Sequence, residues 1–169
     1  MNSKTKGNNF EREICKKLSL WLSYGKDDDL FWRTSSSGGR FTQRLKKGLN
    51  TKNQAGDITS TSPQSDFFSR KYLIECKCYK DINIWSLFND MEIKNSVSWW
   101  WNVNNSKAIE INKVLILIIR QNFKKDIMLT GNEFPDIIQP IAYFFVKKIK
   151  VYDFNSIIQS DPSIFLENK

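Results

Sequence analysis

The pattern of apolar and polar positions predicts a helix at the start of the chain and strands over most of the remainder. Between residues 6 and 24 apolar side chains recur at helical spacing, with a cap at Asn8 or Asn9 and a stop at Gly25. Helical content is also expected at 85–105 and 155–160. Short runs rich in β-branched and aromatic residues predict strands at 30–34, 56–59, 72–77, 113–122, 126–130, 141–146 and 151–152.

Two features of this pattern organise the expected fold. The uninterrupted apolar run 113–122 is typical of a central strand covered on both faces. Residues 62–70 contain Pro, Ser and Asp and predict a hairpin connection that places 56–59 beside 72–77. The element order predicts an α/β fold of the mixed α+β kind, with a central mixed β-sheet flanked by helices. We expect the run Trp99–Trp101 to pack within this fold rather than to stack on bases.

The strand at 72–77 carries the candidate chemistry. Side chains alternate along a strand, so Glu75 and Lys77 share one face while Cys76 lies on the other. Asp57 lies on the neighbouring strand. Two carboxylates beside a lysine suit a hard divalent cation and a nucleophilic water, the requirements for phosphodiester hydrolysis. The alternative is a same-face ion pair between Glu75 and Lys77, worth about 0.2–1 kcal/mol, which leaves Asp57 unexplained.

Helical phase separates two acids of the first helix. At about 100° per residue, Glu11 falls near the centre of the apolar stripe, whereas Glu13 lies on the opposite face. The stripe consists of Ile14, Cys15, Leu18 and Leu22. An acid within an apolar stripe is uncommon, so we predict that Glu11 belongs to the site. The alternative is that Glu11 is a first-turn carboxylate favoured by the helix dipole.

Composition narrows the chemistry further. With 169 residues, 40% of them hydrophobic, the chain is long enough for one domain with a substantial core. The net charge of +8 favours a polyanionic partner such as nucleic acid. The chain contains no histidine, which excludes Ser-His-Asp triads, Cys-His proteases and nucleases with a histidine base. The three cysteines predict reduced thiols, and the polar N-terminus and short apolar runs predict a cytoplasmic protein without a membrane segment.

A basic segment precedes Asp57. Between Leu30 and Gly56 there are six basic residues and no acidic one. Such segments are commonly solvated loops, but this one also has the guanidinium, ammonium and hydroxyl donors that bind phosphate oxygens. Its position directly before Asp57 favours contact with a DNA backbone. The predicted DNA-binding residues are Arg33, Ser35, Ser36, Arg40, Arg44, Lys46 and Lys47.

The combination of Asp57 with Glu75-Cys76-Lys77 on adjacent strands resembles the restriction-endonuclease-like, or PD-(D/E)xK, nuclease superfamily. A closer resemblance is to the archaeal-type Holliday junction resolvases and their phage-encoded relatives, through Lys6-Gly7, Glu11-Arg12-Glu13 and Arg33-Thr34-Ser35. It covers a nuclease core at about 6–122 and leaves 123–169 as a C-terminal extension within one domain, 1–169. The sequence departs from the pattern in its longer basic loop, 38–54, and in lacking a Pro before Asp57.

This resemblance implies a Mg²⁺-dependent (or Mn²⁺-dependent) endodeoxyribonuclease that resolves Holliday junctions. Asp57, Glu75, the Cys76 backbone carbonyl and, through water, Glu11 would hold one or two metal ions, while Lys77 would orient or deprotonate the attacking water. Arg33 and a hydroxyl of Ser35, Ser36 or Ser37 would hold the scissile phosphate. The implied partner is branched duplex DNA, and paired nicking implies a homodimer.

Other functions remain open at this point. A restriction-type or flap-type nuclease of the same fold would use the same residues on a different DNA. A DNA-binding module of this fold would bind DNA with strong salt dependence and would not cut it. A membrane-surface protein is least favoured, because the sequence contains no strongly basic amphipathic helix with an aromatic face.

Overall fold

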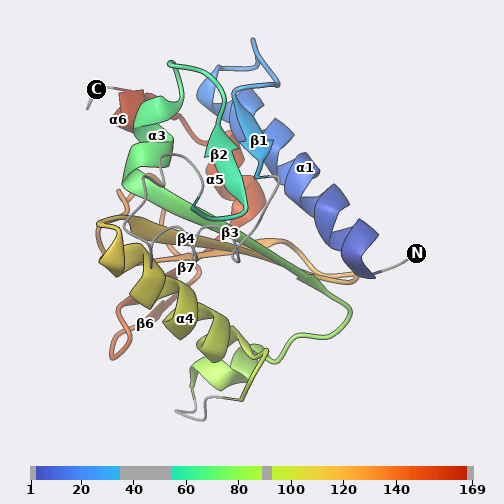
Figure 1. The fold of residues 1–169 in the computed structure, drawn as a ribbon. Coiled ribbons are helices and arrows are strands. Elements are labelled where there is room, and N and C mark those ends of the chain that lie inside the picture. Colours follow the sequence, from blue (N-terminus) through green and yellow to red (C-terminus); the bar gives the residue numbers. More distant parts are fainter. Residues whose placement is uncertain (1–2, 35–54, 89–92, 167–169) are drawn as a thin grey trace.

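The computed structural model describes residues 3–34, 55–88 and 93–166, which form a mixed β-sheet with helices on both faces (Figure 1). The elements are, in chain order, α1 (Ser3–Leu22), β1 (Phe31–Arg33), β2 (Ile58–Ser60), α3 (Asp66–Lys71), β3 (Tyr72–Tyr79), the 3-10 helix η1 (Ile84–Leu87), α4 (Val97–Glu110), β4 (Val114–Gln121), β5 (Ile127–Thr130), β6 (Ala142–Phe144), β7 (Ile149–Asp153), α5 (Phe154–Gln159) and α6 (Ser163–Leu166).

Within the described residues the sheet has seven strands in the order β1-β2-β3-β4-β5-β7-β6. Strands β3 and β4 are parallel, and the other neighbouring pairs are antiparallel. The predicted fold class, a central mixed sheet flanked by helices, is therefore confirmed. The apolar run 113–122 forms β4 in the middle of the sheet, where Leu117 and Ile118 are fully buried. Covering on both faces removes any need for polar alternation along this strand.

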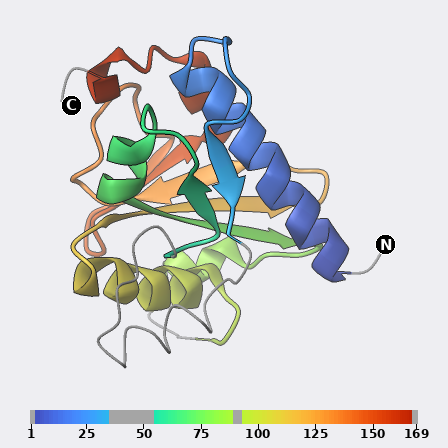
Figure 2. The same ribbon diagram turned by 45° about the horizontal axis from the view of Figure 1, so that its top comes forward.

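The two faces of the sheet are covered by different helices, α1 on one side and α4 on the other (Figure 2). Alternation along β3 shows this division. Tyr72, Ile74 and Cys76 pack in the buried cluster that contains the apolar stripe of α1, whereas Leu73 packs in the cluster that contains Trp100 of α4. Glu75 and Lys77 continue the Leu73 face, as the period of two predicts.

Helix α1 follows its predicted phase. All four residues of the apolar stripe are buried. Gly25 has a φ of 78°, and its N–H donates to the Leu20 carbonyl, an arrangement typical of a glycine beyond a helix C-terminus. The helix begins three residues earlier than predicted, at Ser3.

Three sequence expectations require correction. Residues 62–70 are not a simple hairpin turn, because they include most of α3, although β2 and β3 are antiparallel as expected. The helical content expected at 85–105 divides into η1 and α4 with non-helical residues between them. Strand β6 is shorter than the predicted 141–146. The Trp99–Trp101 run packs as expected, since Trp100 and Trp101 are buried.

Residues after 122 contribute to the same sheet as those before it. Strand β5 pairs with β4, and Tyr152 of β7 and Phe154 of α5 are fully buried in the cluster that contains α1. The three cysteines, Cys15, Cys76 and Cys78, are free thiols, as predicted. In the described part of the chain, no helix is long and apolar enough to cross a membrane.

Arg120 of β4 attaches α1 to the sheet. Its guanidinium donates to both carboxylate oxygens of Glu13 at 2.6 and 2.7 Å and to both oxygens of Asp126 at 2.6 and 2.7 Å. The same group lies 4.5 Å from the ring centre of Phe10. Glu13 therefore has a specific partner across the interface, whereas its helical phase had indicated only the outer face of α1.

Candidate active site

Strand β2 separates from β3 at Gly56 and Asp57. Ile58 pairs with Ile74, and continuing this register by one residue places Asp57 opposite Glu75. The Asp57 N–H still donates to the Ile74 carbonyl at 2.8 Å, but Gly56 has a φ of 82° and turns the chain away. The Cys76 N–H consequently has no strand partner here and donates to Asp57 Oδ2 at 2.9 Å. This hydrogen bond fixes the Asp57 carboxylate at the end of the β2–β3 pairing.

Gly56→Ala is expected to destabilise the fold by about 2–4 kcal/mol, because a side chain is strained at this φ and its Cβ would lie 2.6 Å from the Ile74 backbone oxygen. Urea unfolding measures the loss. Gly7→Ala in α1 is the matched control, since a Cβ there meets nothing within 4 Å, and the expected result is a gain of about 1 kcal/mol. Equal stabilities for Gly56→Ala and wild type would contradict this account of how Asp57 is placed.

The predicted carboxylates and lysine lie together. Lys77 Nζ is 3.1 Å from Glu75 Oε2 and 3.5 Å from Asp57 Oδ2. Asp57 and Glu75 are each only 6% exposed, while the Lys77 side chain is 21% exposed. Oxygens from two strands thus surround one cationic group that remains accessible from solvent. The structure brings these three residues together as the sequence predicted, and the surface ion pair between Glu75 and Lys77 does not describe this buried arrangement.

Sequence reasoning missed a second lysine. Lys107 of α4 lies 3.0 Å from Glu75 Oε1, so each oxygen of Glu75 contacts a different ammonium group. The signal was present in the helical spacing, because Lys107 follows buried Trp100 by seven residues and buried Asn104 by three. These offsets place Lys107 on the face of α4 that packs against the sheet.

The charges of this cluster act on one another. Burial raises the pKa of Asp57 to about 7, and the charge of Glu75 acts in the same direction. Burial also opposes ionisation of Glu75, but Lys77 and Lys107 outweigh it and hold the pKa of Glu75 below its ordinary value. For Lys77, burial acts to lower the pKa, yet the charges of Asp57 and Glu75 raise it above its ordinary value. Lys77 is therefore an ammonium ion at neutral pH.

The donor set fits a small hard cation. Asp57 and Glu75 supply carboxylate oxygens, and a cation between them would relieve the repulsion and burial that raise the pKa of Asp57. A strand residue directs its N–H and C=O to the same edge, so the Cys76 carbonyl faces the Asp57 side, where its N–H already donates. The described residues hold no group of three or more acidic, cysteine or histidine side chains suited to a metal. Mg²⁺ commonly binds through one or two carboxylates and completes its shell with water and substrate phosphate.

Glu11 and Arg33 form a separate pair on the α1 face of the sheet. Arg33 Nε donates to Glu11 Oε2 at 2.7 Å, and its Nη2 donates to Asn8 Oδ1 at 3.0 Å. Among the described contacts, no hydrogen bond or ion pair joins Glu11 to Asp57, Glu75 or Lys77. Glu11 still acts on the site through space, because its negative charge is a minor contribution to the raised pKa of Asp57, after burial and Glu75.

Most of the predicted DNA-binding residues lie outside the described residues. These are Ser35, Ser36, Arg40, Arg44, Lys46 and Lys47. The residues that flank this segment are described: Ala55 lies two positions before Asp57 in the chain, and Thr34 is hydrogen-bonded to Asp57 and Gly56. The Thr34 N–H donates to the Asp57 carbonyl at 2.9 Å, and the Thr34 hydroxyl donates to the Gly56 carbonyl at 2.8 Å. The basic segment therefore leaves and rejoins the described fold next to the candidate site.

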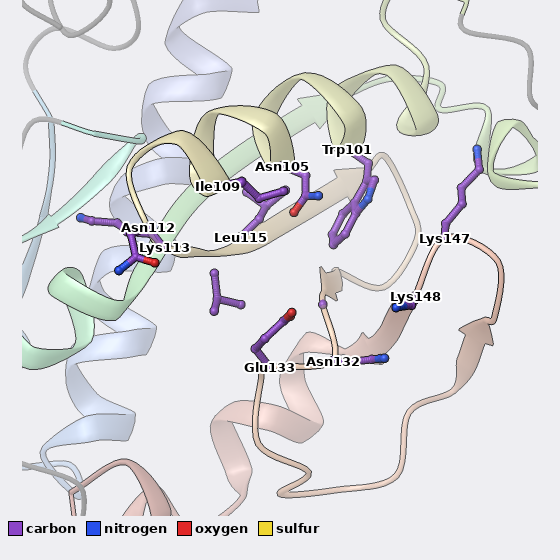
Figure 3. Close-up of a pocket in the computed structure, with 12 residues that line it drawn as sticks. Trp101, Asn105, Ile109, Asn112, Lys113, Leu115, Asn132, Glu133, Lys147 and Lys148 are labelled. Carbon is purple, nitrogen blue, oxygen red and sulfur yellow. The ribbon is translucent and has the colours of Figure 1, made fainter.

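A cavity of about 560 Å³ lies elsewhere, between α4, the start of β4 and the segments that flank β6. In Figure 3, Trp101 and Asn105 from α4 and Glu133 from the segment after β5 surround this space. Its lining contains none of the predicted site residues. The cavity and the carboxylate–lysine cluster are thus distinct features of the molecule.

Comparison with protein-family models gave a match over residues 2–158 to a family described as “phage putative PDDEXK endonuclease”. This match covers most of the chain and includes residues on both sides of position 122. No curated protein and no solved structure matched the chain.

Proposed function

The chain belongs to a phage endonuclease family of the PD-(D/E)xK nuclease superfamily, and on this premise we propose that it is a metal-dependent endonuclease that hydrolyses phosphodiester bonds in DNA. The main support is the position of two buried carboxylates, Asp57 and Glu75, around the ammonium group of Lys77. The proposed nuclease domain is the whole chain, 1–169, since strands from both sides of residue 122 share one sheet.

Asp57, Glu75 and the Cys76 carbonyl would hold Mg²⁺ or Mn²⁺, which supplies a Lewis acid for the phosphate and for the attacking water. The Cys76 N–H orients Asp57 for this role through its 2.9 Å hydrogen bond. Lys107 donates to Oε1 of Glu75, the oxygen that does not contact Lys77. These contacts fix the two carboxylates before substrate binds, which lowers the cost of organising the site.

Lys77 acts as a cation in this proposal. Its pKa lies above the ordinary value, so it donates hydrogen bonds and does not accept a proton at neutral pH. A fixed ammonium beside the carboxylates orients the water and stabilises the charge that develops on the phosphate oxygens. The sequence allowed Lys77 either to orient the attacking water or to deprotonate it. We propose that Lys77 orients the water and stabilises the developing charge.

Substrate contacts would come from the basic segment and from the α1 side of the site. The segment carries five of the six basic residues found between positions 30 and 56, and it joins the described fold at Thr34, which is hydrogen-bonded to Asp57, and at Ala55, two positions before Asp57. Arg33 would bind the scissile phosphate while paired with Glu11. Glu11 would either orient Arg33 or contact the metal ion through water. We retain branched DNA, and a Holliday junction in particular, as the substrate proposed from the motifs at 6–13 and 33–35. The phage family favours the host cytoplasm as the place of action.

Paired nicking of a junction would require a homodimer. The apolar run Trp99–Trp101 is unsuited to a dimer interface, because Trp100 and Trp101 are buried inside the fold. In the apolar segment 141–146, by contrast, Ile141, Phe145 and Val146 are 64%, 81% and 92% exposed. The proposed interface is therefore the region around β6.

A panel of DNA substrates tests this function directly. Wild type and Lys77→Ala are incubated with Mg²⁺ or Mn²⁺ and with a four-way junction, a flap, linear duplex or single-stranded DNA. The expected result is metal-dependent cleavage by wild type only, with symmetric paired nicks in the junction. Preferential cleavage of flap or linear DNA would identify the protein as a flap-type or restriction-type nuclease and would contradict junction resolution. Strong, salt-sensitive binding without any product would identify a DNA-binding module instead.

A further inference from the structure

Tyr79 is an exposed aromatic residue on the same strand as Glu75 and Lys77 of the candidate site. It ends β3 and, by the alternation of the strand, shares the face that carries Glu75 and Lys77. Two residues along a strand correspond to about 7 Å, so Tyr79 immediately follows Lys77 on this face. Its side chain is 42% exposed, although most large hydrophobic residues of β3 and β4 are buried.

The Tyr79 ring is held in a fixed orientation from one side. It stacks on Trp100 with a centroid distance of 4.9 Å and an interplanar angle of 24°. Trp100 itself is 2% exposed and belongs to the buried cluster between α4 and the sheet. One face of the tyrosine thus rests on the core while the exposed part of the ring faces solvent. A pre-oriented aromatic surface loses little conformational freedom when another flat ring packs against it.

We propose that Tyr79 stacks on an unpaired nucleobase next to the phosphate held at Asp57, Glu75 and Lys77. This inference rests on the proposed function and specifies its substrate class, DNA with at least one unstacked nucleotide at the cleavage point. Duplex DNA hides the faces of its bases within the stack, so a tyrosine at this position favours single-stranded or branched DNA. Base–aromatic stacking does not depend on sequence, because every base has a π-face.

Other exposed aromatic residues fit this role less well. Trp85 is 70% exposed, but it packs against Phe88, which in turn packs against Phe144 of β6. Trp85 belongs to η1, Phe88 directly follows it and Phe144 lies on the edge strand β6, and none of these segments carries Asp57, Glu75 or Lys77. Trp85 therefore provides a matched control, an exposed aromatic residue whose loss is expected to leave base stacking at the site unchanged.

The test measures binding to two oligonucleotides with equal numbers of phosphates, an oligothymidylate and its fully abasic counterpart. Dissociation constants are determined with Ca²⁺ present for wild type, Tyr79→Leu, Tyr79→Phe and Trp85→Leu. Removing the bases is expected to weaken binding by wild type and by Tyr79→Phe. Tyr79→Leu should bind oligothymidylate about 5- to 150-fold more weakly than wild type, the range that corresponds to stacking on one base. It should bind the abasic strand as wild type does, and Trp85→Leu should behave as wild type on both strands.

The decisive result is whether Tyr79→Leu weakens binding only when bases are present. If Tyr79 merely covered Trp100, its loss would weaken binding to oligothymidylate and to the abasic oligonucleotide alike. Equal losses on the two strands, or no binding of oligothymidylate by wild type, would overturn the stacking proposal. The catalytic proposal is judged separately by cleavage with wild type and Lys77→Ala. A protein that cuts DNA through Lys77 yet shows no coupling at Tyr79 would keep the proposed function and lose this inference.

Discussion

Asp57→Asn, Glu75→Gln and Lys77→Met are each expected to lower the rate of DNA cleavage by about a thousandfold or more. The two amides keep the shape of the acids but remove the charges that would bind the proposed divalent cation, and loss of a metal contact costs several kcal/mol of transition-state stabilisation. Lys77→Met keeps the chain length and removes the ammonium group that lies within 3.5 Å of both carboxylates. Single-turnover cleavage at saturating protein and metal measures the effect.

Two control variants match these changes in chemistry but not in position. Glu110→Gln alters an exposed acid at the end of α4, and Lys80→Met alters an exposed lysine just beyond β3. Both should cleave within about twofold of wild type, the small effect usual for surface substitutions. DNA binding by the three site variants should remain close to that of wild type. Cleavage at the wild-type rate in all three would remove these residues from the proposed active site.

The stability of Asp57→Asn shows whether the variant loses catalysis or loses its fold. Burial and the neighbouring Glu75 raise the pKa of Asp57 from its ordinary value of 3.8 to about 7, so ionisation of Asp57 destabilises the folded protein increasingly as the pH rises from about 4 to 7, and fully above pH 7. Asp57→Asn removes that charge and still offers an oxygen to the Cys76 N–H. The variant should therefore be at least as stable as wild type toward urea at pH 8 without metal, while cleavage is lost. Such opposite effects are typical of a residue retained for function at a cost in stability.

Local periodicity was sufficient to predict much of this site. The period of two placed Glu75 and Lys77 on one face, and the uninterrupted run 113–122 identified the central strand, because both features depend only on neighbouring residues. The short helix α3 was missed within 62–70, where Pro, Ser and Asp indicated a turn. Phe68 of α3 packs against Trp21 of α1, and this tertiary contact outweighs the weak local helix propensity.

Long-range partners could not be predicted in the same way. The helical phase of Glu13 indicated the outer face of α1 and gave no sign of its partner, Arg120 of β4, which is 107 residues away in the sequence. Only the packing of α1 over β4 brings the two together. Lys107 differs, because its spacing from Trp100 and Asn104 on α4 carried a usable local signal. That signal indicates the sheet-facing side of the helix and not the contact with Glu75, which depends on how α4 crosses β3.

Arg120→Met is expected to destabilise the fold by about 3–5 kcal/mol, since it leaves the Asp126 carboxylate, 5% exposed, without the guanidinium that binds both its oxygens. Urea unfolding at pH 7 measures the loss. Arg120→Lys should recover only part of it, because one ammonium cannot replace two bidentate contacts. Arg120→Met combined with Asp126→Asn should be more stable than Arg120→Met alone, because it removes a buried charge whose remaining cationic neighbour is Lys17 at 3.9 Å. If Arg120→Met were as stable as wild type, the guanidinium would make no net contribution to the free energy of unfolding.

The same contact predicts an acid dependence of stability. Hydrogen bonds from Arg120 are the main cause that lowers the pKa of Glu13 to about 2 from an ordinary value near 4.5. A depressed pKa contributes stability that is present above about pH 4.5 and is lost as the pH falls toward 2. Because the Glu13 side chain is 40% exposed, solvent screening limits the contribution to about 1 kcal/mol. Glu13→Gln should therefore be less stable than wild type by about this amount at pH 6, with the difference disappearing near pH 2. A difference that stays constant across this range would assign the effect to packing of the side chain rather than to its charge.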